Sequence, residues 1–180
     1  TLTFDVDGDG MEDETTIQGR FLADSELTFT NEKPYVIYGY AAISSDKKLT
    51  INAGAKIHFH KNSGLIVDKK GSLEVNGTLH EKVVFEGDRL EHRFNNVPGQ
   101  WGTIWMRAGS KENKINHALI KNGVIGILVD SIGTLTSPTL TIKNTEIYNN
   151  SNYGILGRDT NIKGENIVIG NAGQSSLACT

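Results

Sequence analysis

Short runs in which apolar and polar residues alternate follow one another along most of the chain. Examples are Leu49-Thr50-Ile51, Ile57-His58-Phe59 and Leu73-Glu74-Val75. Alternation with a period of two predicts β-strands that bury one face. Glycines such as Gly54 and Gly64 separate the runs, and glycine accepts the positive φ of a tight turn at little cost. No long stretch has the apolar spacing of an amphipathic helix, so the pattern predicts an all-β fold.

A short motif recurs three times in the C-terminal part of the chain. It is an apolar residue, any residue and then Asn, followed after a gap by a small residue and a second apolar one. The apolar positions fall at Ile120, Ile147 and Ile169, in steps of 27 and 22 residues, and at Ile127, Ile155 and Leu177, in steps of 28 and 22. Repeats of this length indicate a solenoid, in which each coil buries its apolar side chains against its neighbours.

The same period occurs in the N-terminal half. Leu49-Thr50-Ile51-Asn52 resembles Leu73-Glu74-Val75-Asn76, which lies 24 residues further on. A weaker match of Ile57-His58-Phe59 to Val83-Val84-Phe85 gives a step of 26. A propeller blade needs about 40 residues, and a sandwich has no reason to repeat its sequence. The period therefore predicts a parallel β-helix, with three short strands and three turns per coil.

In such a fold the repeated positions stack along the axis. Ile120, Ile147 and Ile169 are expected to form one inward stack, and the second apolar positions another. The motif asparagines are expected at one corner, as turn formers whose side-chain amides bond each other in an Asn ladder: Asn122, Asn149 and Asn171.

Three segments interrupt the repeat. Residues 1–32 are expected to form an N-terminal segment that carries an acidic loop and caps the helix, and residues 33–180 the parallel β-helix. Insertions are expected at 86–113, which holds both tryptophans, and at 130–139. The third motif starts close to Thr180, so we expect the helix to be truncated at its C-terminus. Insertions in solenoids often form the binding face.

These features resemble the right-handed parallel β-helix proteins of the pectate-lyase-like fold. Within that group, the chain looks most like predicted surface lipoproteins of Gram-negative bacteria. The matching stretches include Leu73-Glu74-Val75-Asn76-Gly77 and cover residues 33–39, 49–57, 64–67, 71–78, 84–89, 98–101 and 116–178. The resemblance implies a right-handed, single-stranded parallel β-helix with coils of about 22–28 residues.

The resemblance also implies a location and a role. Such proteins are secreted and tethered to the outer membrane by a lipidated cysteine near the mature N-terminus, and their molecular role is mostly unassigned. The one cysteine here is Cys179, so either the anchor lies upstream of Thr1 or this part of the resemblance does not apply. We expect an extracellular or outer-membrane location, with other outer-membrane or cell-surface proteins, or glycans, as partners.

The composition indicates which partners and which covalent links are not expected for this chain. The net charge is -3 and the longest basic runs are pairs, which gives no basic surface for nucleic acid. No run of 18 apolar residues occurs, so no membrane-spanning segment is expected. A single cysteine excludes an intrachain disulfide.

An acidic loop near the N-terminus has the spacing of a calcium site. Asp-Val-Asp-Gly-Asp-Gly-Met-Glu-Asp places carboxylates at alternate positions, with glycine where the loop must turn sharply. Thr16 stands where an EF-hand has its bidentate Glu, so the loop looks more like those of extracellular repeats. The alternatives are a Ca²⁺ site and a solvated acidic turn. The expected ligands are Asp5, Asp7, Asp9, the carbonyl of Met11, and Asp13.

A second candidate site surrounds the long insertion. Asp88, Arg89, Trp101 and Trp105 are a possible ligand face, although burial of the tryptophans and an Asp88–Arg89 salt bridge are the competing interpretations. His58 and His60 share a strand face, as a surface pair or, with a third ligand, a metal site. The sequence favours a non-catalytic binding or structural module within a larger assembly. The alternative is a carbohydrate-active enzyme, such as a polysaccharide lyase or glycoside hydrolase, or a glycan-binding protein.

Overall fold

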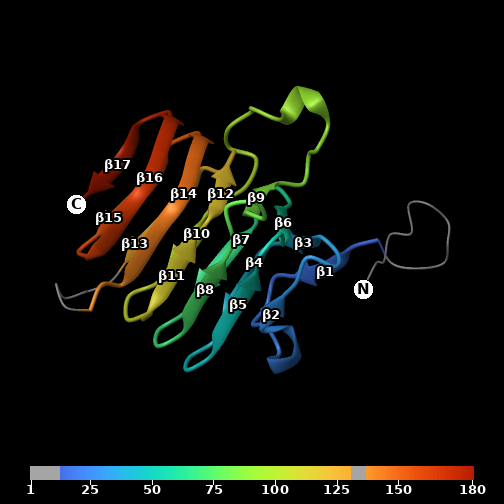
Figure 1. The fold of residues 1–180 in the computed structure, drawn as a ribbon, viewed down its shortest axis with the longest axis horizontal. Helices are drawn as coiled ribbons and strands as arrows, with labels where there is room; N and C mark the ends of the chain where they lie inside the picture. Colours follow the sequence, from blue (N-terminus) through green and yellow to red (C-terminus); the bar gives the residue numbers. More distant parts are fainter. Residues whose placement is uncertain (1–12, 131–136) are drawn as a thin grey trace.

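The structure is a computed structural model that describes residues 13–130 and 137–180. These residues form a right-handed parallel β-helix in which every strand pairing is parallel. The coils follow one another along the axis from β1 to β17, as the colours of Figure 1 show. The all-β fold and the β-helix predicted from the sequence are thus confirmed.

Each coil contributes strands to three faces. The first face contains β1 (Thr15–Gln18), β3 (Tyr35–Tyr38), β6 (Lys56–Phe59), β9 (Val83–Gly87) and β12 (Ala118–Lys121). The second contains β2 (Thr28–Phe29), β5 (Lys48–Asn52), β8 (Ser72–Asn76) and β11 (Asn113–Asn116). The long strands β14 (Leu140–Asn150) and β16 (Ile162–Ala172) run through both faces and join them into one sheet.

The third face is a separate six-stranded sheet. It contains β4 (Tyr40–Ile43), β7 (Gly64–Val67), β10 (Ile104–Met106), β13 (Ile125–Asp130), β15 (Tyr153–Arg158) and β17 (Ser175–Cys179). Two 3-10 turns, η1 (Asp24–Glu26) and η2 (His92–Phe94), lie between strands.

The core consists of the inward side chains of successive coils stacked on one another. Ile120, Ile147 and Ile169 pair in register, and so do Ile127, Ile155 and Leu177, as the repeat predicts. Leu49 pairs with Leu73, which confirms the step of 24 residues. Ile57, however, pairs with Phe85, so the predicted match of Ile57 to Val83 is wrong by two residues.

The asparagine corners are built partly as expected. Asn122, Asn149 and Asn171 all have positive φ, so they form turns. Asn171 donates to the side-chain oxygen of Asn149 at 3.2 Å, but the amide of Asn122 bonds the Asn95 carbonyl at 3.0 Å instead. A longer ladder runs at another corner, where Asn166 donates to Asn144 at 2.8 Å and Asn144 to Asn116 at 2.9 Å.

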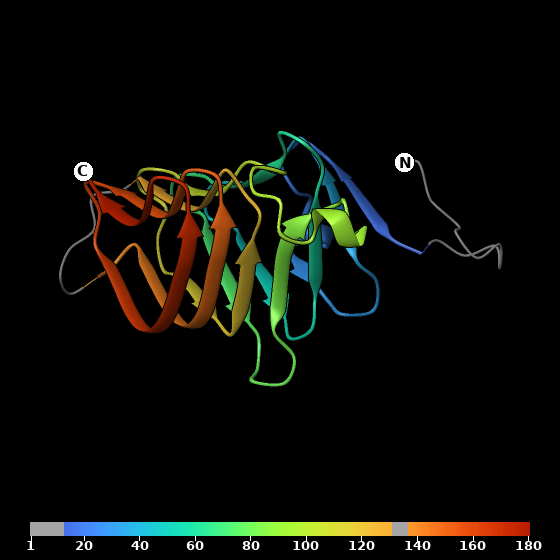
Figure 2. The same ribbon diagram turned by 90° about the horizontal axis from the view of Figure 1, so that it is seen from above.

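The interrupting segments are shorter than the sequence suggests. Strand β10 lies inside 86–113 and pairs with β7 and β13, so only about residues 88–100, which we call the 88–100 loop, leave the coil. Figure 1 shows its η2 turn standing outside the coils, and Figure 2 shows the coils stacked side by side along the axis. Within 1–32, β1 pairs with β3 and β2 with β5, so these strands form a coil of the helix itself. Most of 130–139 lies outside the described residues.

Candidate functional site

A groove lies on the outer side of β3, β6 and β9, next to the 88–100 loop. It has a volume of about 290 Å³. Polar and apolar side chains share its lining: Glu14, Pro34, Val36, Tyr38, His58, Asp88 and Leu90. We call it the histidine groove.

The parallel register brings the polar side chains of the groove together. Val36 pairs with His58, and His58 with Glu86, so one outward row crosses three strands. Hydrogen bonds from the His60 amide to the Ile37 carbonyl and from the Asp88 amide to the Phe59 carbonyl continue the alignment past the strand ends.

His60 and Asp88 form an ion pair or hydrogen bond at the groove. The His60 Nδ1 to Asp88 Oδ2 distance is 2.7 Å, and the Tyr38 ring lies 4.9 Å from the His60 ring. Burial raises the pKa of the Tyr38 hydroxyl, and the nearby negative charges of Glu14 and Asp88 raise it further. Tyr38 therefore stays a neutral donor beside two acidic side chains.

His58 lies deeper and is almost fully buried, with 5% of its surface exposed. Burial lowers the pKa of its imidazole, and the Glu86 carboxylate only partly opposes this. The His58 Nδ1 to Glu86 Oε1 distance is 3.7 Å, too long for a hydrogen bond, and Nδ1 has no hydrogen-bond partner among the described residues. Glu86 instead pairs with Lys121 at 2.9 Å, and both side chains are largely buried.

The 88–100 loop is fastened to the helix by amide side chains. Within the loop, Gln100 donates to the carbonyls of Phe94 at 2.7 Å and Val97 at 2.8 Å, and these bonds hold the loop together. Asn149 donates to the side-chain oxygen of Asn96 at 3.2 Å, in addition to the Asn122 bond described above. The loop is therefore held at one wall of the groove by contacts with two coil corners.

The expected Asp88–Arg89 salt bridge is replaced by two separate pairings. Asp88 contacts His60, whereas the Arg89 guanidinium lies 3.8 Å from the centre of the Phe94 ring and 3.7 Å from Glu91. Asp88 directly follows β9 and faces the neighbouring coil, while Arg89 lies one residue further into the loop. The amide contacts, not this pair, fasten the loop.

The two tryptophans do not join Asp88 and Arg89 in one surface. Trp101 is 1% exposed, stacks on Phe59 at 4.4 Å and donates its indole N–H to the Lys121 carbonyl at 2.8 Å. Trp105 lies on the outer side of β10, in the six-stranded sheet, and donates to Asp130 at 2.7 Å. The structure thus places one indole in the core and the other on a different face.

The expected calcium loop is outside the part of the chain that can be examined. Asp5, Asp7, Asp9 and Met11 lie outside the described residues, and Asp13 stands at their border. Across 13–130 and 137–180, no group of three or more His, Cys, Asp or Glu side chains is arranged to hold a metal ion. In the same ranges, no helix is long and apolar enough to cross a membrane.

Sequence reasoning missed that Tyr38, His58 and Asp88 line one groove, and that Glu86 lies beside His58. The spacing between successive coils could have shown that these residues are neighbours. A step of 28 residues places His58 beside Glu86 and His60 beside Asp88, whereas the predicted step of 26 separates them. His58 and His60 do face the same side, as their alternation indicates, but His58 is buried rather than part of a surface pair.

The coil geometry and register define this chain as a right-handed parallel β-helix protein with a polar groove on one face. A family model described as a pectate-lyase-like β-helix domain matches residues 21–129. That match covers more than half of the 180 residues, so the chain belongs to the pectate-lyase-like β-helix family. The curated proteins and the solved structures compared with the chain gave no match.

Proposed function

We propose that this chain is a non-catalytic, surface-exposed β-helix module that binds its ligand in the histidine groove. The observation that carries the proposal is the groove itself, a volume of about 290 Å³ on a face built from paired strands and closed on one side by a fastened loop. Specific sites are concave, largely preformed, and combine apolar surface with a few placed polar groups.

The lining favours an uncharged, hydroxyl-rich ligand such as a neutral glycan. Pro34, Val36 and Leu90 offer apolar surface to the C–H groups of a sugar ring, and the carboxylates of Glu14 and Asp88 accept hydrogen bonds from hydroxyl groups. The same two carboxylates repel an anionic polysaccharide, because like charges in a partly desolvated groove raise the free energy of binding.

Binding of neutral and acidic oligosaccharides to the purified chain, measured by calorimetry, tests this proposal. Replacing Asp88 with Asn should weaken binding of a neutral glycan by about 10- to 100-fold, since a hydrogen bond to a charged group contributes about 1.5–3 kcal/mol. Asp24, which pairs with Lys47 outside the groove, supplies the control substitution D24N. Binding that survives D88N unchanged would reject the groove as the site.

A carbohydrate-active enzyme is the second candidate, and the His60–Asp88 contact is what favours it. A carboxylate that orients an imidazole is a general-base arrangement, and Tyr38 stands beside it as a proton donor. Incubation with polysaccharide panels, followed by assays for new reducing ends and unsaturated products, separates the candidates. Turnover by the wild type that is lost in His60→Gln would show that the chain is an enzyme and not a non-catalytic binding module.

We propose an outer-membrane or other extracellular location for the protein, with cell-surface proteins or glycans as its partners. The support is the sequence resemblance to surface lipoproteins. Protease treatment of intact bacteria that produce the full-length protein tests it. A protein that is degraded only after the cells are lysed would contradict the surface location.

We further propose that the loop of Asp5, Asp7, Asp9, Met11 and Asp13 binds Ca²⁺. Its support is the alternate spacing of carboxylates around glycine. Ca²⁺ that binds the folded chain should raise the melting temperature with concentration, and the double substitution of Asp7 and Asp9 with Asn should remove the rise. An equal rise in that variant, or none in the wild type at millimolar Ca²⁺, would contradict the site.

A further inference from the structure

An unbroken apolar row runs along the outer face of the six-stranded sheet. In β4, β7, β10 and β13 the flanking side chains point into the core and the central one points outward, as with Ile104 and Met106 around Trp105. The outward residues pair in register from coil to coil: Ala42, Ile66, Trp105, Leu128, Leu156 and Ala178. Phe21, which is 58% exposed, bridges to Ala42 and extends the row by one coil.

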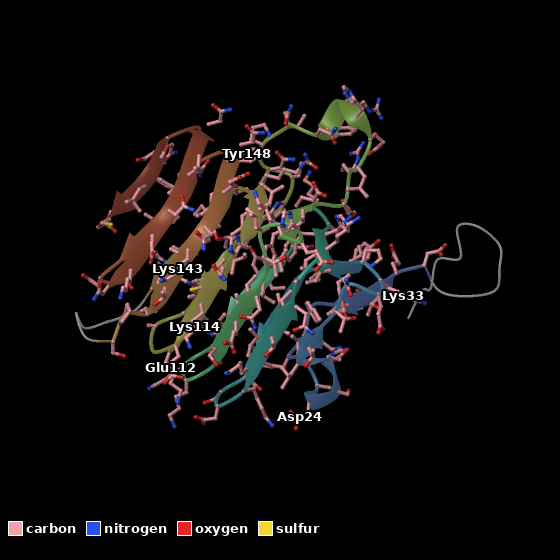
Figure 3. The ribbon with its side chains drawn as sticks, viewed as in Figure 1. Asp24, Lys33, Glu112, Lys114, Lys143 and Tyr148 are labelled. Carbon is pink, nitrogen blue, oxygen red and sulfur yellow. The ribbon has the colours of Figure 1, made fainter. Side chains whose placement is uncertain are left out.

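The other long sheet carries no comparable row at its matching position. There the outward residues in register are polar: Thr28, Thr50, Glu74, Lys114, Thr141 and Lys163. Figure 3 labels Lys114 and Lys143 on this polar face. A sheet face open to water normally carries polar outward residues. A contiguous row of half-buried apolar side chains, with Leu128 8% exposed and Phe21 58% exposed at its end, therefore favours an interaction surface.

Charged side chains of alternating sign run beside the apolar row. They lie two residues further along each central strand, in the order Asp68, Arg107, Asp130 and Arg158, with Ser44 before them and Thr180 after them. Arg107 contacts Asp68 at 3.2 Å, and Arg158 pairs with Asp130.

We propose that this face binds the same face of a second copy of the chain in an antiparallel, two-fold dimer. A two-fold axis that runs along the strands turns one face onto the other and reverses the order of the coils. With the axis between β10 and β13, Asp68 faces Arg158 of the second copy and Arg107 faces Asp130. In the same register, Ile66 meets Leu156 and Trp105 meets Leu128.

The charges select this register over its neighbours. A shift that centres the axis on β10 sets Asp68 against Asp130 and Arg107 against itself, and a shift to β13 sets Arg107 against Arg158. Like charges across an interface cost free energy, whereas complementary rows fix the register. A surface that is complementary to itself under a two-fold rotation is the usual basis of a homodimer.

The area predicts a weak dimer. Six strands about 4.8 Å apart, each of some five residues, cover on the order of 500 Å² in projection. This is below the roughly 800 Å² per partner of a standard stable interface, so a reversible dimer with a dissociation constant on the order of micromolar is expected.

Sedimentation equilibrium of the 180-residue chain over a range of concentrations tests the proposal. The wild type should show a monomer–dimer equilibrium, and Leu156→Glu should be monomeric at every concentration, because the carboxylate would be buried against Ile66 of the other copy. Lys163→Glu, on the polar face, should dimerise like the wild type. A monomeric wild type, or a Leu156→Glu dimer of unchanged strength, would overturn the proposal.

A charge swap tests the register independently of folding. Arg158→Glu should weaken the dimer about tenfold or more, and adding Asp68→Arg should restore it. Within one chain these residues are three strand spacings apart, about 14 Å, so the recovery can come only from contact between copies. If the double variant dimerises no more tightly than Arg158→Glu alone, the antiparallel register is wrong.

Discussion

At the scale of single residues, His58 is the buried titratable group whose protonation folding opposes. Burial lowers the pKa of its imidazole from the ordinary value of 6.5. The unfolded chain therefore binds the proton first, and stability is lost as the pH falls below 6.5 towards the lower pKa of the folded state. Once the pH is below both values, the loss is complete.

Urea unfolding at a series of pH values between 7.5 and 5 should measure this loss, since those values bracket the ordinary pKa of histidine, about 6.5. His58→Leu should flatten the profile over that window. His80→Gln, at an exposed histidine, should leave the profile as it is in the wild type. If His58→Leu follows the wild-type profile, another group is responsible.

Trp101 and Trp105 should differ sharply in their contribution to stability. Truncation of the buried Trp101 to Ala should cost about 3–5 kcal/mol, because it empties the space against Phe59 and removes the bond to the Lys121 carbonyl. Trp105→Ala should cost less, since this ring lies on the outer face. Denaturant unfolding at concentrations below dimerisation measures both, and equal costs would contradict the assigned positions.

At the scale of elements, the sequence predicted coils well because each stack needs a similar residue at a fixed interval. Ile120, Ile147 and Ile169 recur for that reason, and their registers were predicted correctly. The predicted match of Ile57 to Val83 is wrong because both possible partners, Val83 and Phe85, are apolar and inward. Alternation alone cannot distinguish two registers that differ by two residues. Because of this error of two residues, the predicted register did not place His60 beside Asp88 and so did not reveal the groove.

The Asn116–Asn144–Asn166 ladder combines a turn with a chain of amide bonds. Asn144 has φ of 47° and both accepts from Asn166 and donates to Asn116. Asn144→Gly keeps the backbone conformation and loses the two bonds, and should cost about 1–2 kcal/mol. Asn144→Ala loses the same two bonds but keeps a Cβ in the left-handed region, so it should be less stable than Asn144→Gly by about 1–2 kcal/mol.

Chemical denaturation of the two variants separates the contributions. The difference between Ala and Gly measures the backbone strain, and the difference between Ala and wild type measures the amide side chain. Equal stability of Asn144→Ala and the wild type would show that the ladder adds nothing beyond the turn.

At the scale of the whole molecule, the repeats account for the core but not for the groove or the apolar row. A repeated sequence specifies stacking between neighbouring coils, whereas the groove depends on which outward residues happen to share a register, such as His58 with Glu86. The outward positions are free to vary in each coil, so their arrangement becomes visible only when the strands are aligned.

Stability in such a molecule should vary along the axis, because each coil is held mainly by its neighbours. In β17, the inward Leu177 is 54% exposed, whereas the inward Phe85 and Ile120 of β9 and β12 are completely buried. The amides of the coil of β16 and β17 should therefore open with a smaller free energy than those of the central coils.

Hydrogen–deuterium exchange followed by mass spectrometry measures this gradient in the 180-residue chain. Peptides that cover β16 and β17 should exchange first, and peptides from β9 and β12 last. Ile147→Ala should speed exchange in β16 and β12, which pair with β14, more than in β8 and β5, which lie two and three coils away. A uniform increase over all peptides would instead indicate that the coils unfold as a single cooperative unit.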